Sequence, residues 1–249
     1  MAGHSKWANI KFRKQAQDAK RGKIFTKLIK EITVSARTGG GDPESNPRLR
    51  TAIQKAKQNN MPMKNIENAI KKGTGEIPGV VYEEITYEGY GPGGVAVMVE
   101  CMTDNKNRTV GEIRHLFSKY GGNLGESGSV SYLFEKKGII RILKEKYDEE
   151  ELMMLAIDAG AEDVETEDEF YIVYTTFENL NNVKKVLEEN NIDIESAEVE
   201  QIPSTTIQLD EDGAKKMMKL MNFLEDHDDV QNVWANFDID DEILNSLDA

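Results

Sequence analysis

Apolar residues in the first third of the chain recur at the spacing of one helix face. Across residues 15–37 they fall three or four positions apart, which predicts an amphipathic helix. The apolar positions are Ile24, Phe25, Leu28, Ile29 and Ile32. Gly22 could end this helix early, because glycine is a poor helix former, and residues 11–20 would then form a separate first helix.

Two shorter helices follow a turn rich in glycine. Asn46 before Pro47 is typical of a helix start, because the asparagine side chain caps the first turn and proline fits the first helical position. The second helix is expected to run to about Asn59. The third is expected to cover residues 61–73 and to end at Gly73. These segments predict a small helical bundle over residues 1–75.

The hydrophobic pattern changes after a linker at residues 73–79. Residues 80–87 alternate as a strand does, and residues 95–102 form a nearly continuous apolar run, which is typical of a buried strand. Residues 105–120 have the spacing of an amphipathic helix, and residues 130–134 predict another strand. These elements read as the first half of an α/β domain.

A complete set of six alternating elements comes next. Its predicted strands are residues 139–143, 163–167, 170–174 and 192–199, and its predicted helices are residues 149–159 and 178–190. The order β-α-β-β-α-β is that of a split β-α-β, ferredoxin-like unit. The pattern therefore predicts a small domain that is complete within this segment.

The last elements complete the interrupted unit. They are a strand at residues 206–209, a helix at 212–224 and a strand at 230–237. Joined to the strand and helix pattern of residues 95–134, they give β-α-β, an insertion, and β-α-β.

The expected fold class is therefore α+β and multidomain, a small helical bundle followed by two ferredoxin-like domains, one inserted in the other. The predicted bounds are 1–75 for the basic helical bundle, 80–135 plus 204–249 for the outer domain and 136–203 for the inserted domain. Consecutive, uninterrupted domains are the alternative.

Charge divides the chain more sharply than its total suggests. The whole chain has 31 basic and 45 acidic residues, a formal net charge of −14. Residues 1–73 contain 17 of the basic and only 5 of the acidic side chains. Such asymmetry indicates a nucleic-acid or other anionic partner for the basic part. The simpler alternative is that the basic and acidic parts attract each other within the chain.

Cations and one aromatic residue of the basic part are the candidate nucleic-acid contacts. Lys20, Lys23, Lys27 and Lys30 fall within a sector of roughly 80° on the first predicted helix, away from its apolar side. Trp7 could stack on a base or cap the bundle core. The full candidate set is Lys6, Trp7, Lys11, Arg13, Lys14, Lys20, Arg21, Lys23, Lys27, Lys30, Arg48, Arg50 and Lys55.

Few residues suggest catalysis or metal binding. The single cysteine, Cys101, lies in a predicted buried strand without a neighbouring histidine, so a core thiol is expected. His115 is expected to be a partly exposed structural histidine. His227 lies in an acidic stretch that could hold a cation, although an acidic turn between helix and strand explains it more simply. No catalytic motif is present, so neither enzymatic activity nor a cofactor is expected.

Other classes of protein are also disfavoured. The longest apolar stretch, residues 95–99, is too short to cross a membrane, and one cysteine suits a reducing compartment. An enzyme acting on a small anion would require a convergent pocket. A purely protein-binding adaptor would bind nucleic acid equally well after charge reversal of the predicted lysine row.

Long strings of this sequence resemble the YebC family, in order and over essentially the whole chain. They are AGHSKWANIK from Ala2, AKRGKIFTKLI from Ala19, GGDP from Gly40, NPRLR from Asn46, NMP from Asn60, YEGYGPGG from Tyr87, TDNKNRT from Thr103 and GGNLGESGS from Gly121. Phe12 departs from the family, many members of which have a histidine there. Such strings are more specific than any short motif.

The resemblance implies a non-enzymatic regulator of gene expression. Family members are described as probable DNA-binding transcriptional regulators of the bacterial cytoplasm, with one helical and two α/β domains. Mitochondrial relatives are translational activators, and bacterial relatives have been linked to relief of ribosome stalling at proline-rich stretches. The resemblance implies no cofactor or catalytic residue and leaves DNA and RNA open as partners. If the partner is ribosomal RNA, the acidic domains are expected to contact ribosomal proteins or tRNA.

Overall fold

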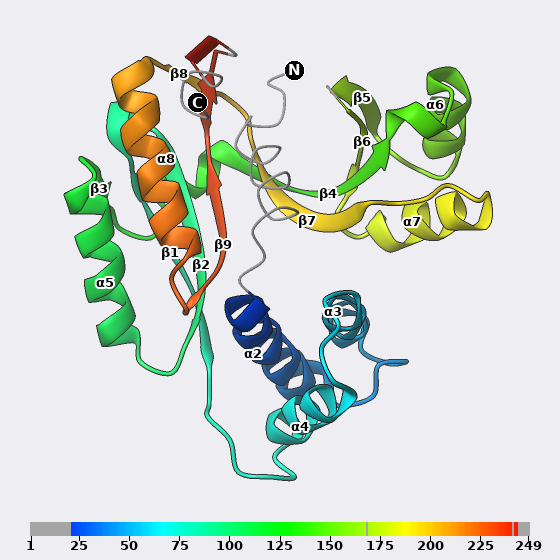
Figure 1. Cartoon of the computed structure of the whole chain (residues 1–249), viewed down its shortest axis with the longest axis horizontal. Helices are drawn as coiled ribbons and strands as arrows, with labels where there is room; N and C mark the ends of the chain where they lie inside the picture. The colour runs from blue at the N-terminus through cyan, green and yellow to red at the C-terminus, as the bar shows by residue number, and fades with distance from the viewer. Residues whose placement is uncertain (1–20, 168, 241, 244–249) are drawn as a thin grey trace. The chain divides into compact units, whose positions relative to one another are not determined.

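In the computed structural model, residues 21–75 form a bundle of three helices (Figure 1). The structure describes residues 21–167, 169–240 and 242–243. Helices α3 (Pro47–Gln58) and α4 (Met63–Thr74) pack against α2 (Arg21–Gly39) around a core that contains Ile32 and Leu49. The predicted separate helix at residues 11–20 lies outside the described residues.

Side chains at the helix ends fix the bundle. The Asn46 side-chain oxygen accepts the Leu49 N–H at 3.1 Å, and its amide donates to the Ser35 carbonyl at 2.8 Å, so the predicted cap also ties α3 to α2. Helix α4 extends one residue beyond its predicted end and is capped by Gly75, with φ of 81°. Gly73 is needed for packing instead, because a Cβ there would lie 2.4 Å from the Thr33 carbonyl oxygen of α2.

A four-stranded antiparallel sheet follows, in the order β3-β1-β2-β9. Its strands are β1 (Glu83–Tyr90), β2 (Ala96–Thr103), β3 (Asn123–Leu124) and β9 (Val230–Ala235). Helices α5 (Lys106–Lys119) and α8 (Glu211–Glu225) lie against one face of this sheet and share its core (Figure 1). A short helix, η1 (Pro92–Gly94), connects β1 to β2.

The predicted strand at residues 130–134 is wrong. A single helical turn, η2 (Ser131–Leu133), occupies most of this segment, and β3 pairs with β1 instead. The reason is Glu88, whose buried carboxylate accepts the N–H groups of Gly128, Val130 and Ser131, each at 2.8 Å. These hydrogen bonds outweigh burial and lower the pKa of Glu88. Backbone donors that a neighbouring strand would use are therefore already bonded.

The chain order β-α-β, insertion, β-α-β is present as β2, α5 and β3 and then β8 (Ile207–Leu209), α8 and β9, but these strands do not form the predicted single ferredoxin-like sheet. Strand β1, which the sequence left outside that unit, lies in the middle of the sheet between β3 and β2. Strand β8 pairs in parallel with β10 (Phe237–Ile239) in a separate two-stranded sheet. The expected strand at residues 230–237 is interrupted at Asn236, whose side-chain oxygen accepts the Ala96 N–H at 2.7 Å.

The segment Leu133–Ser204 forms a compact unit of its own. Its elements are β4 (Phe134–Leu143), η3 (Lys144–Lys146), α6 (Glu149–Asp158), β5 (Asp163–Glu167), β6 (Phe170–Thr176), α7 (Leu180–Glu189) and β7 (Ser196–Pro203). The antiparallel strand order β5-β6-β4-β7 and the β-α-β-β-α-β chain order agree with the predicted split β-α-β unit.

The mixed α+β fold class is confirmed. The second compact unit contains both the helical bundle and the outer sheet, whereas their hydrophobic cores are separate clusters. We therefore retain the division into domains 1–75, 80–135 plus 204–249, and 136–203 as a proposal. No helix in the described parts of the chain has the length and apolar character needed to span a bilayer.

Candidate nucleic-acid interface

Three lysines of the predicted row on α2 contact the end of α8 and the turn that follows it. The Lys23 ammonium donates to the Asp226 carbonyl oxygen at 2.7 Å and pairs with the Asp226 carboxylate at 2.6 Å. Lys27 donates to the Glu225 carbonyl oxygen at 2.7 Å. The last carbonyls of a helix have no partner within it and carry partial negative charge, so they attract cations. We call Lys23, Lys27 and Lys30 the α2 lysine row.

Lys30 is buried at the third position of this row. Its ammonium group pairs with Asp229 at 2.7 Å and donates to the carbonyl oxygens of Asp228 and Met102 at 2.8 and 3.2 Å. It also lies 5.4 Å from the ring centre of Tyr82. The side chains of Lys30 and Asp229 are only 7% and 6% exposed, so this pair is shielded from solvent.

The Asp229 carboxylate also accepts hydrogen bonds from groups outside α2. Arg108 and Thr109 donate to its second oxygen at 2.7 and 2.8 Å. Burial by itself would raise the pKa of Asp229, but the hydrogen bonds from Lys30, Arg108 and Thr109 outweigh it and hold that pKa well below its ordinary value. The carboxylate therefore remains ionised and links α2 to the outer sheet.

The candidate residues on α3 are also bonded within the chain. Arg48 pairs with Glu31 at 2.7 Å and with Glu84 at 2.6 Å. Burial alone would lower the pKa of Arg48, but its hydrogen bonds to both glutamates raise it further above its ordinary value. Arg50 donates to the Pro43 and Glu44 carbonyl oxygens at 3.1 and 3.3 Å.

The remaining candidates are Lys55, which is half-buried on α3, and Arg21, which begins α2. The other predicted contacts lie outside the described residues; they are Lys6, Trp7, Lys11, Arg13, Lys14 and Lys20. The structure thus brings Lys23, Lys27 and Lys30 together, but at an internal contact, and it leaves Arg48 and Arg50 apart from them in separate contacts.

Four other lysines in the described part of the bundle are exposed. Lys57 on α3 and Lys64, Lys71 and Lys72 on α4 form no ion pair with any residue that the structure describes. The sequence offered only a weak signal for them, because Lys71 and Lys72 are explained equally well as partners of the α4 C-terminal dipole. Their exposure is what makes them available to phosphate groups.

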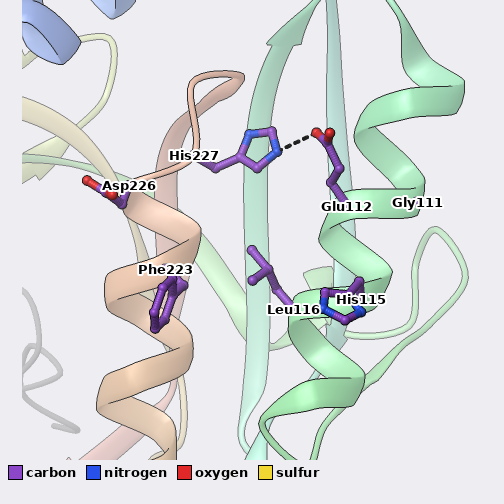
Figure 2. A pocket seen from close by; sticks show the side chains of 7 residues that line it. All are labelled: Gly111, Glu112, His115, Leu116, Phe223, Asp226 and His227. Atoms are coloured by element: carbon purple, nitrogen blue, oxygen red, sulfur yellow. Dashed lines mark hydrogen bonds and ion pairs between the residues drawn. The ribbon is translucent and has the colours of Figure 1, made fainter.

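A cavity of about 410 Å³ lies between α5 and α8 (Figure 2). Its lining residues are Gly111, Glu112, His115, Leu116, Phe223, Asp226 and His227. The His227 ring accepts the Asp229 N–H through Nδ1 at 3.1 Å, and its Nε2 lies 2.8 Å from a Glu112 carboxylate oxygen. With Nδ1 accepting, Nε2 is the nitrogen that donates to Glu112.

One group of side chains has the spacing of metal ligands: Glu112, His227 and Asp229. They fit a cation poorly, because both Asp229 oxygens already accept hydrogen bonds from Lys30 and Arg108, two cationic groups that would repel a metal. The arrangement instead favours a hydrogen-bonded acidic turn. His115 is exposed on α5, and Cys101 is fully buried, where burial raises the pKa of its thiol to about 12.

Comparison with known protein families covers nearly the whole chain. Residues 5–76 match the model of the TACO1/YebC protein N-terminal domain. Residues 82–237 match the model of the TACO1/YebC second and third domain.

Curated relatives and a solved structure agree with these matches. A protein of Persephonella marina named "Probable transcriptional regulatory protein" is 60% identical over 249 residues, which cover 99% of this chain and 100% of the relative. A protein of Sulfurihydrogenibium sp. named "Probable transcriptional regulatory protein SYO3AOP1_0685" is 60% identical over 251 residues and covers 100% of both chains.

The crystal structure of the conserved hypothetical protein Aq1575 from Aquifex aeolicus superimposes with a TM-score of 0.83 at 57% identity. The superposition covers 91% of this chain and 94% of that one. With both family models matched in order along the sequence, the chain belongs to the TACO1/YebC family.

Proposed function

We propose that this protein is a non-enzymatic regulator of gene expression that binds nucleic acid through residues 1–73. The observation that carries the proposal is the charge of this part, 17 basic against 5 acidic side chains, joined to a strongly acidic remainder. Lysine and arginine contacts to phosphate supply most of the affinity of sequence-independent nucleic-acid binding. The names of the relatives, which are probable transcriptional regulatory proteins, support a role in transcription.

The internal contacts of the α2 lysine row narrow the proposed surface. Lys30 is buried, and Lys23 and Lys27 are occupied by the end of α8. The exposed lysines of α3 and α4 are therefore the described cations best suited to phosphate, and the basic residues that precede α2 in sequence add to them. Acidic side chains elsewhere would repel a phosphate backbone and confine it to this module.

A translation factor is the second candidate function. Reading base edges from α3 would require Arg48, Arg50 or Lys55, and the two arginines are bonded to groups of the chain itself. Contact by phosphate and shape, without base reading, suits folded RNA better than a specific DNA site. In this case the acidic domains would contact ribosomal proteins or tRNA in the cytoplasm.

Removal of the exposed bundle lysines tests the proposed surface. The full chain with Lys57, Lys64, Lys71 and Lys72 changed to Gln should bind duplex DNA or folded RNA at least about tenfold more weakly near 100 mM salt, because several phosphate contacts are lost. A matched control changes Lys144, Lys146, Lys184 and Lys185 of the inserted unit to Gln, the same change in charge. Equal weakening by both variants would refute a binding surface on the bundle.

Crosslinking in cells distinguishes the two functions. Nucleic acid crosslinked to the protein by ultraviolet light is sequenced after separate treatment with DNase and RNase. Recovery of promoter duplexes supports transcriptional regulation, whereas ribosomal RNA clustered at one region supports the translation function. Recovery of neither would contradict nucleic-acid binding as the cellular activity.

A further inference from the structure

Two aromatic side chains stack on the outside of the acidic outer domain. Tyr120, at the C-terminal cap of α5, and Phe223, on α8, have ring centres 5.3 Å apart and ring planes inclined by 19°. Phe223 is 47% exposed, although most large apolar residues of α8 are fully buried. Its ring therefore offers an open apolar surface beside the cavity between the two helices (Figure 2).

One lysine lies close to both rings, and two more share the α8 face of Phe223. The Lys119 ammonium group lies 5.4 Å from the ring centre of Tyr120 and 5.5 Å from that of Phe223. Lys219 and Lys216 precede Phe223 by four and seven positions, so they share its face of α8. Both are exposed and form no ion pair within the described chain. We call these five residues the aromatic platform.

The two carboxylates that line the cavity beside the platform have cationic or polar partners. At the other end of the cavity the Glu112 carboxylate is bonded to His227, and Asp226 is paired with Lys23. Lys119, Lys216 and Lys219 are exposed and form no ion pair with any described residue. They are positive, although residues 74–249 contain 40 acidic and only 14 basic side chains. An anionic ligand that also presents a flat ring matches this combination.

The platform is close to the start of the basic module. Asp226, which binds Lys23 near the beginning of α2, follows Phe223 by one helical turn and lines the same cavity. One turn of helix advances about 5 Å. Phe223 therefore lies about one helical turn from the point where the outer domain contacts α2 of the basic module.

We propose that the aromatic platform binds an unpaired base of single-stranded nucleic acid, with Phe223 as the stacking surface and Lys119, Lys216 and Lys219 against the flanking phosphates. This inference rests on the proposed nucleic-acid binding and adds the kind of strand that is recognised. Stacking on an aromatic side chain accepts any base, whereas a base inside a duplex is already stacked and cannot reach the ring. The platform should therefore distinguish single strands from duplexes.

The test uses the full chain and a short oligonucleotide that contains one fluorescent 2-aminopurine. Because stacking quenches this base, the wild-type protein should quench it in single-stranded RNA and in single-stranded DNA of the same sequence. Phe223→Leu keeps an apolar side chain on α8 but removes the ring. It should abolish quenching and weaken binding of the single strand by about 5- to 150-fold, with little effect on duplex binding, and Phe223→Trp should restore both.

The inserted unit supplies a matched control. Phe177 is 41% exposed and has the Lys136 ammonium group 4.6 Å from its ring centre, so it repeats the pair of an aromatic ring and a lysine. Phe177→Leu should leave quenching and affinity unchanged. Thermal unfolding of each variant checks that the fold is retained.

The possible outcomes separate the two proposals. If the wild-type chain binds nucleic acid but Phe223→Leu changes neither quenching nor affinity, the platform is refuted and the proposed function stands. Equal weakening of single-strand and duplex binding by Phe223→Leu would also refute it. If the wild-type chain binds neither single strands nor duplexes, the proposed function itself fails.

Discussion

The lysines of α2 lie in the basic part of the chain but are bonded within the chain. The lysines of the aromatic platform lie in the acidic part but are exposed. Lys23, Lys27 and Lys30 belong to the basic part, yet each is bonded to an acidic or carbonyl group near the end of α8. Lys216 and Lys219 belong to the acidic part, yet both are exposed and form no described ion pair. The charge of a segment therefore does not establish which of its cations a ligand can reach.

The largest expected effect is the salt dependence of nucleic-acid binding, which tests whether exposed lysines bind phosphates at all. If the basic module contacts six to ten phosphates, affinity should fall roughly 10³- to 10⁵-fold between about 50 and 200 mM salt. Fluorescence anisotropy of a labelled oligonucleotide across a salt series measures this slope. A flat response would show that free lysines do not carry the binding.

The buried pair of Lys30 and Asp229 should matter for stability. Asp229→Ala leaves the Lys30 ammonium group buried without its carboxylate partner, which should lower the free energy of unfolding by about 3–5 kcal/mol. Denaturant unfolding measures the change. Glu189→Ala, which removes the partner of exposed Lys185, is the control and should cost at most about 1 kcal/mol. Similar losses for both variants would contradict the internal role assigned to the α2 lysine row.

Acid should weaken the same contact. The pKa of Asp229 is lowered in the folded chain, so its ionised form stabilises the fold above the ordinary aspartate pKa of about 3.9, and this contribution is lost as the pH falls below that value. Between about pH 4 and pH 2, the free energy of unfolding should fall more steeply for wild type than for Asp229→Asn. The difference is up to about 1.4 kcal/mol per pH unit. Parallel pH profiles would show that Asp229 titrates normally.

The smallest expected effect is the change in salt dependence when a single lysine is replaced. Lys64→Gln should reduce the slope of log affinity against log salt by about 0.9, the value for one lost phosphate contact with duplex DNA. Lys27→Gln should leave the slope unchanged, because its ammonium group is bonded to the Glu225 carbonyl oxygen. The same change in slope for both variants would mean that Lys27 leaves its internal contact when nucleic acid binds.

Local sequence pattern predicted the inserted unit better than the outer domain, and the reason lies in where backbone donors are bonded. Strand β5 has its predicted bounds because alternating residues pair with the adjacent strand β6. The segment of residues 130–134 is more apolar than β5, but the N–H group of Val130 binds Glu88, 42 positions earlier in the chain. A carboxylate that distant leaves no periodic signal, so the local pattern predicts a strand where the chain forms a turn.

The candidate site shows the same limit. Helical spacing placed Lys23, Lys27 and Lys30 on one face, as observed, because that geometry depends only on the helix. The packing of α2 against the end of α8 determines which groups these lysines contact. Helical spacing carries no information about that packing. The stacking of Tyr120 on Phe223 likewise joins two helices about a hundred positions apart, and neither residue is distinctive in its own segment.

Mapping the crosslinked peptides tests the central claim most directly. The full chain is irradiated with bound nucleic acid, and mass spectrometry identifies which peptides carry nucleotides. The proposed function predicts crosslinks within residues 1–73, and the further inference adds the peptide that contains Phe223. Crosslinks concentrated in Leu133–Ser204, with none in residues 1–73, would contradict the assignment of nucleic-acid binding to the basic module.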